Sequence, residues 1–97
     1  MDRGLLLSTR RLTVHGRVQG VFYRAWTVDT GNALGLRGWV RNRRDGTVEI
    51  LVSGDAAAVE RFIGRCRRGP PAARVERIDI DDALQEVPAR FEKRPTL

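Results

Sequence analysis

Alternation of apolar and polar residues predicts five short strands. Leu12 and Val14 fall on one face of the first strand, as expected for a side-chain period of two. Val75 is out of step with Ile78 and Ile80 in the fourth strand, which predicts a β-bulge near that position. The predicted strands are Thr9–His15, Leu36–Asn42, Thr47–Val52, Ala73–Asp81 and Phe91–Thr96.

A period of 3.6 residues predicts two helices between these strands. In Ala56–Arg67, an apolar stripe recurs at i, i+3, i+4 and i+7, and consists of Val59, Phe62, Ile63 and Cys66. The second prediction is Phe22–Leu34, ended by Gly35 at a position where a positive φ is common. Its expected inward residues are Phe22, Ala25, Val28 and Ala33.

The predicted order is β-α-β-β-α-β followed by a short extra strand. This order is typical of a ferredoxin-like α+β sandwich, with a mixed or antiparallel sheet and both helices on one face. Asp45-Gly46 predicts a tight hairpin between the second and third strands. Residues 1–7 are expected to be a loose N-terminus, and residues 8–97 a single domain.

Composition fits one small domain that remains in the cytoplasm. The chain has 97 residues, 41% of them apolar, and no apolar run approaches the length of a membrane span. Leu5-Leu6-Leu7 is too short for the apolar core of a signal peptide. The single cysteine, Cys66, excludes an internal disulfide and a multi-cysteine metal site, and is expected to be a buried apolar residue.

The net charge of +6 comes from 17 arginines and one lysine, Lys93, against 12 acids. Such a surface would steer an anionic substrate inward and would bind nucleic acid weakly and salt-sensitively. We expect most of these arginines to form a solvated surface without a specific nucleic-acid partner. The solvated set is Arg10, Arg11, Arg43, Arg44, Arg67 and Arg68.

Candidate chemistry begins with G-R-V-Q-G-V-F-Y-R, Gly16 to Arg24. Free amides at a loop and a helix start can bind an anion, and an arginine fork matches phosphate oxygens. The segment therefore predicts a phosphate-binding loop, although a plain strand-to-helix turn has the same pattern. A second candidate is Asn42, just before the Asp45-Gly46 turn, where asparagine also serves simple turn chemistry.

Taken together and in this order, the two segments strongly resemble the acylphosphatase family. The match covers Gly16 to Ile50 and continues more weakly through Arg68 to Val75 and Phe91 to Thr96. The family has the ferredoxin-like fold. The resemblance implies a hydrolase that converts acyl phosphates to a carboxylate and inorganic phosphate.

The resemblance also implies a role for each matching residue. Arg24 would bind the phosphoryl group, and Asn42 would orient the attacking water. The loop amides would form the phosphate-binding loop: Gly16, Arg17, Val18, Gln19, Gly20, Val21 and Phe22. Thr47 is either a positioning partner of Asn42 or a plain strand residue, and His15 is expected to be a strand-end residue without a catalytic role.

No metal or cofactor is expected. The loop lacks a cysteine nucleophile, and the chain has no Walker lysine pattern and no acids spaced for magnesium. The expected partner is a small acyl phosphate, and the expected state is a monomer. The acyl group itself is not readable from the sequence.

Three residues depart from the usual family pattern. Gly31 replaces alanine inside a helix, Tyr23 replaces phenylalanine and needs a partner for its hydroxyl, and Lys93 replaces an apolar residue of the last strand. Trp26, Trp39 and Tyr23 are expected to be packing residues, with Trp39 partly exposed between Arg37 and Arg41.

Two other classes of function remain as alternatives. A ferredoxin-like RNA-binding module would agree with the basic charge, but the third predicted strand, T-V-E-I-L-V, has no aromatic residue for base stacking. An interaction domain without turnover would not need Arg24 and Asn42 together. The chain is also shorter than the hydrogenase-maturation carbamoyltransferases that begin with an acylphosphatase-like domain, which favours a stand-alone enzyme.

Overall fold

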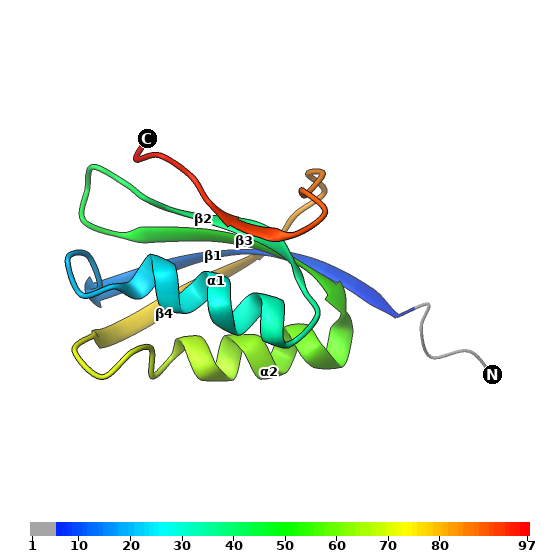
Figure 1. Cartoon of the computed structure of the whole chain (residues 1–97), viewed down its shortest axis with the longest axis horizontal. Helices are drawn as coiled ribbons and strands as arrows, with labels where there is room; N and C mark the ends of the chain where they lie inside the picture. Colours follow the sequence, from blue (N-terminus) through cyan, green and yellow to red (C-terminus); the bar gives the residue numbers. More distant parts are fainter. Residues whose placement is uncertain (1–5) are drawn as a thin grey trace.

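Two helices cover one face of a five-stranded sheet in a computed structural model that describes residues 6–97 (Figure 1). The strand order is β4-β1-β3-β2-β5, with antiparallel neighbours except for the parallel pair β2 and β5. The ferredoxin-like α+β prediction is therefore confirmed. The elements are β1 (Leu7–Arg17), α1 (Tyr23–Ala33), β2 (Arg37–Asn42), β3 (Val48–Asp55), α2 (Ala56–Cys66), β4 (Arg74–Asp82) and β5 (Phe91–Lys93).

The core lies between the sheet and the helices, as the alternation of apolar and polar residues in the strands predicted. Leu12 and Val14 of β1 and Ile50 of β3 are fully buried, and Val59 and Phe62 of α2 meet them from the helix layer. Asp55 caps α2, because its carboxylate accepts a hydrogen bond from the Ala58 amide at 3.2 Å. The apolar stripe predicted for the second helix is confirmed.

The inward face predicted for α1 is wrong at three of its four residues. Phe22 is 82% exposed and Ala25 and Ala33 are exposed, whereas Val28 is half-buried and packs against the core. The buried residues of α1 are Tyr23, Thr27, Thr30 and Gly31.

These buried residues recur at the spacing of an α-helix, but three of them are polar or small, so they do not form an apolar stripe in the sequence. Thr27 can be fully buried because its hydroxyl donates to the Tyr23 carbonyl oxygen at 2.7 Å within the same helix. An apolar scan therefore selects the wrong phase of the helix.

Strand ends differ from the prediction in ways that shape the site. β1 is longer than Thr9–His15 and includes Gly16 and Arg17. Its pairing with β4 shifts register between His15 and Gly16, which is the bulge expected near Val75. β5 ends at Lys93 instead of Thr96, although Arg94 and Leu97 still donate backbone hydrogen bonds to β2. Residues 1–5 of the expected loose terminus lie outside the described part, whereas residues 6 and 7 are held by backbone hydrogen bonding and β1 begins at Leu7.

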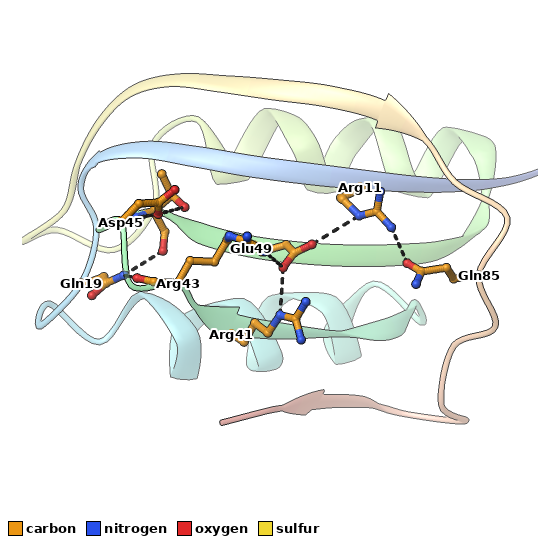
Figure 2. A network of polar contacts seen from close by, with 8 residues as sticks. Arg11, Gln19, Arg41, Arg43, Asp45, Glu49 and Gln85 are labelled. Atoms are coloured by element: carbon orange, nitrogen blue, oxygen red, sulfur yellow. Dashed lines mark hydrogen bonds and ion pairs between the residues drawn. The ribbon is translucent and has the colours of Figure 1, made fainter. Parts of the chain in front are cut away.

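Arginines, and not solvent, cover much of the sheet face that lacks helices. Glu49 of β3 is only 6% exposed and accepts hydrogen bonds from Arg41 at 2.8 Å and Arg43 at 2.9 Å (Figure 2). Arg11 Nε lies 3.3 Å from the other Glu49 oxygen, as an ion pair without hydrogen-bond geometry. Arg11 and Arg43 therefore do not belong to the solvated set. The same holds for Arg10, which forms ion pairs with one acid of α2 and one of β4.

Trp39 is 4% exposed, so its predicted partial exposure is wrong. The Arg41 and Arg94 guanidinium groups lie 4.6 Å and 5.2 Å from its ring centroid and cover it by cation–π contact. Such a ring offers no free face for stacking a nucleotide base. Among residues 6–97, no helix is long and apolar enough to cross a membrane.

Candidate active site

A cavity of about 220 Å³ lies where the β1–α1 loop, the first turn of α1, the end of β2 and β5 meet. The loop and the β2–β3 turn lie at the same end of the molecule in Figure 1. Arg24 and Asn42, which are 18 positions apart in the sequence, line it together. The lining residues are Val18, Gly20, Phe22, Tyr23, Arg24, Ala25, Asn42 and Lys93.

The phosphate-binding loop predicted from Gly16 to Phe22 divides into two parts. Gly16 and Arg17 belong to β1 and pair with β4, and a Cβ on Gly16 would lie 2.1 Å from the Arg74 carbonyl oxygen. Gly16 is therefore required by the close approach of β4. Val18 and Val21 are buried anchors of the loop between β1 and α1.

Phe22 gives α1 an unusual start. Its φ of 65° makes it the one non-glycine residue with positive φ in the described chain, a conformation that costs about 1 to 2 kcal/mol. No side chain caps this end of α1, and the first backbone bond of the helix runs from the Trp26 amide to the Phe22 carbonyl oxygen. The amides before Trp26 therefore have no acceptor in the helix.

Those amides belong to Tyr23, Arg24 and Ala25, and all three residues line the cavity. Unpaired N–H groups and the positive end of a helix dipole favour an anion. The first turn contains no acid, so no carboxylate of α1 competes for them. Arg24 adds a full positive charge to the same turn.

Asn42 ends β2 on the sheet face that the helices cover. Val40, two residues earlier, is fully buried on that face, and side chains two apart in a strand point the same way. Asn42 Oδ1 is buried and has no hydrogen-bond partner among residues 6–97. A buried acceptor without a partner is costly, which suits an oxygen that accepts a hydrogen bond from bound water or ligand.

Gln19 fixes the loop to the hairpin that carries Asn42. Its side-chain amide donates to the carbonyl oxygens of Arg43 at 2.7 Å and Thr47 at 2.8 Å (Figure 2). The Arg43 amide in turn donates to the Thr47 carbonyl oxygen. Gln19 therefore sets the distance between the loop and Asn42 through its side chain, in addition to any role of its backbone amide.

Thr47 contacts Asp45 and forms no hydrogen bond with Asn42 Oδ1. Its hydroxyl donates to Asp45 Oδ1 at 2.6 Å and its amide donates to the same oxygen at 3.0 Å. These two hydrogen bonds hold the pKa of Asp45 below its ordinary value. Thr47 thus stabilises the turn.

His15 and Cys66 are not among the residues that line the cavity. His15 pairs with Asp79 on β4 at 2.9 Å, which agrees with its expected role as a strand-end residue. Burial raises the pKa of the Cys66 thiol to about 12, so this cysteine is a poor nucleophile. Tyr23 donates its hydroxyl to the Cys66 carbonyl oxygen at 2.6 Å, and burial raises its pKa as well.

Three lining residues were not predicted from the sequence: Tyr23, Ala25 and Lys93. The free amides of Tyr23 and Ala25 depend on the backbone conformation at the start of α1, which residue type does not reveal. Lys93 did carry a signal, because a lysine replaces an apolar residue two positions after the buried Phe91.

The acylphosphatase family model matches residues 10–93. Curated acylphosphatases agree closely: that of Rhizorhabdus wittichii is 53% identical over 91% of this chain and 89% of its own length. The Rhodospirillum rubrum acylphosphatase is 47% identical over 94% of this chain and 100% of its own.

Solved structures agree with the sequence relatives. The acylphosphatase from Coxiella burnetii superposes with a TM-score of 0.86 at 31% identity, covering 91% of this chain and 93% of that chain. A structure of full-length HypF has a TM-score of 0.83, but at 24% identity and 12% coverage of HypF this likeness shows the fold alone.

The two-layer sandwich is thus shared with a family of hydrolases. The chain belongs to the acylphosphatase family, whose function is the hydrolysis of acyl phosphates. Its substrate is accordingly a small acyl phosphate.

Proposed function

We propose that the cavity hydrolyses acyl phosphates without a metal, with Arg24 and the first amides of α1 binding the phosphoryl group and Asn42 orienting the attacking water. The observation that carries this proposal is the uncapped start of α1, which opens into the cavity that Arg24 and Asn42 share. Gly20 and Phe22 of the loop complete the wall beside these amides.

Each step of the proposed reaction uses a group of this cavity. Asn42 Oδ1 accepts a hydrogen bond from water, whose oxygen attacks phosphorus as the bond from phosphorus to the acyl oxygen breaks. The acyl group leaves as a carboxylate, which is a weak base and needs no general acid. Arg24 and the amides stabilise charge on the equatorial phosphoryl oxygens. One water proton passes to a phosphoryl oxygen and the other stays on the attacking oxygen, so the products are carboxylate and dihydrogen phosphate.

Hydrolysis of benzoyl phosphate in EDTA tests this proposal with two variants. Arg24→Ala should lower kcat/KM by roughly 10³-fold and abolish competitive inhibition by phosphate, because both need the phosphoryl-binding charge. Asn42→Ala should lower kcat by roughly 10²-fold and leave the inhibition constant of phosphate nearly unchanged, because Asn42 acts on water.

Arg44→Ala is the matched control, because it removes the same charge from an exposed turn position outside the cavity lining. It should retain activity and phosphate inhibition. Equal loss of phosphate binding in the Arg24 and Asn42 variants would overturn the assignment of roles, and loss of wild-type turnover in EDTA would overturn metal independence.

We also propose that residues 8–97 act as one monomeric domain in the cytoplasm, without a cofactor or a specific nucleic-acid partner. One buried core joins the sheet and both helices, which supports a single domain. Light scattering of the active enzyme should give the mass of one chain, 10.9 kDa. A mass of two chains would refute the monomer.

A further inference from the structure

Lys93 occupies the same sheet face as Asn42. In β5, Phe91 is 3% exposed and points into the core, so Lys93, two residues later, points toward the helix-covered side. Lys93 is in register with Val40 of β2, and Asn42 is two residues beyond Val40 on the same face. Lys93 and Asn42 are therefore diagonal neighbours, and both line the cavity.

The cavity contains two cations and no carboxylate. Arg24 and Lys93 line it, and within residues 6–97 neither forms an ion pair. By contrast Arg94, the residue that follows β5, pairs with Glu92 and lies over Trp39 on the opposite face. The Lys93 ammonium is thus available to an anion in the cavity, whereas the Arg94 guanidinium is engaged.

The geometry points to Lys93 as a second phosphoryl-binding cation, acting beside Arg24. This inference rests on the proposed function, in which Asn42 holds water in line with the leaving group. In an in-line displacement the acyl group departs on the side of phosphorus opposite to the water. Lys93 flanks Asn42, so its ammonium faces the phosphoryl oxygens and not the departing acyl group.

The cavity has room for this arrangement. Its volume of about 220 Å³ exceeds the roughly 150 Å³ in which an engineered cavity accommodates benzene. Arg24 and the amides approach from α1, and Lys93 approaches from β5, so two walls carry positive charge. Charge from two sides suits a phosphoryl group whose negative charge is spread over three oxygens.

Inhibition by inorganic phosphate tests the inference, because phosphate carries no acyl group. Lys93→Gln and Lys93→Met should each raise the inhibition constant of phosphate about fivefold, the size of one partly exposed charge contact. Lys93→Met removes the charge but keeps a long unbranched side chain, and thermal melting of both variants checks that the fold persists. Lys93→Arg should stay within about twofold of the wild type, because it retains the charge.

Arg94→Gln is the matched control, since it removes an equal charge one residue away on the opposite face. It should change phosphate inhibition less than twofold at the same ionic strength. Equal effects of Lys93→Gln and Arg94→Gln would overturn the inference, because they would reflect the overall field of the protein.

A second substrate separates phosphoryl binding from acyl binding. If Lys93 bound the acyl side, Lys93→Gln would lower turnover of 4-carboxybenzoyl phosphate relative to benzoyl phosphate and leave phosphate inhibition unchanged. That result would overturn the inference. Failure here would be distinct from failure of the proposed function, because Arg24→Ala tests the latter in the same phosphate assay.

Discussion

At the residue scale, Tyr23 connects the start of α1 with the end of α2. Its ring is 1% exposed, and its hydroxyl donates to the Cys66 carbonyl oxygen at 2.6 Å. That carbonyl belongs to the last turn of α2, where helix geometry supplies no backbone donor. The hydroxyl that departs from the family pattern therefore has a buried partner and ties the two helices together.

Tyr23→Phe should lower the free energy of unfolding by about 1 kcal/mol, because it leaves the Cys66 carbonyl oxygen buried without a donor. Urea unfolding monitored by circular dichroism measures the change. An unchanged unfolding midpoint would mean that water replaces the hydroxyl and that the hydrogen bond carries no net stability.

The sequence predicted the side chains of the site better than its backbone. Arg24 and Asn42 belong to two motifs whose resemblance to one family is specific, and the structure brings both to one cavity. The free amides of Tyr23 and Ala25 depend on the left-handed conformation of Phe22, which no residue pattern indicated. The contact of Lys93 depends on the parallel register of β5 with β2, which the sequence does not determine.

At the element scale, α1 docks on β5 through two residues that a propensity argument undervalues. Gly31 is buried, and a Cβ there would lie 2.4 Å from Cδ2 of the Phe91 ring. Asn32 accepts a hydrogen bond from the Phe91 amide at 3.1 Å through Oδ1. Gly31 is therefore present because the Phe91 ring occupies the space of a methyl group, and its cost in helix propensity is offset by that packing.

Gly31→Ala should destabilise the protein by about 1 to 2 kcal/mol, because displacing a buried ring costs more than the helix propensity gained. Gly64→Ala in α2 is the matched control, since a Cβ there meets nothing within 4 Å. It should stabilise the protein by about 0.5 to 1 kcal/mol. Thermal melting of both variants gives the signs, and stabilisation by Gly31→Ala would contradict the packing of Phe91.

The buried faces of the elements were predicted correctly where the core positions are apolar. They were predicted wrongly where buried polar side chains form hydrogen bonds within the protein. The core positions of β1, β3 and α2 follow directly from apolar period. In α1 the buried side includes Thr27 and Thr30, so the apolar period pointed to exposed residues instead. β1 extends beyond its apolar residues because the backbone of Gly16 and Arg17 still pairs with β4.

At the scale of the whole molecule, Glu49 organises the positive charge on the sheet face opposite the helices. Arg11 of β1, Arg41 of β2 and Arg43 of the following turn all meet its carboxylate on the central strand (Figure 2). Burial alone would raise the pKa of Glu49, but hydrogen bonds from Arg41 and Arg43 outweigh it and hold the pKa below its ordinary value of 4.5.

The lowered pKa fixes the sign of a pH dependence. A carboxylate with a lower pKa in the folded state adds stability above its unfolded pKa, and that stability is lost as pH falls through the folded pKa. Glu49→Gln resembles the protonated side chain in shape. It should therefore destabilise the protein by about 2 kcal/mol at pH 7, less than for a fully buried pair because the three arginines are partly exposed.

The difference in unfolding free energy between the wild type and Glu49→Gln should shrink below pH 4.5 and vanish once Glu49 itself is protonated. Urea unfolding from pH 7 to pH 3 measures it. Glu92→Gln provides the matched control, because it removes an equal charge from an exposed pair with Arg94 and should cost at most about 0.5 kcal/mol. A Glu49→Gln deficit that is constant across this range would mean that packing, and not charge, holds the arginines over the sheet.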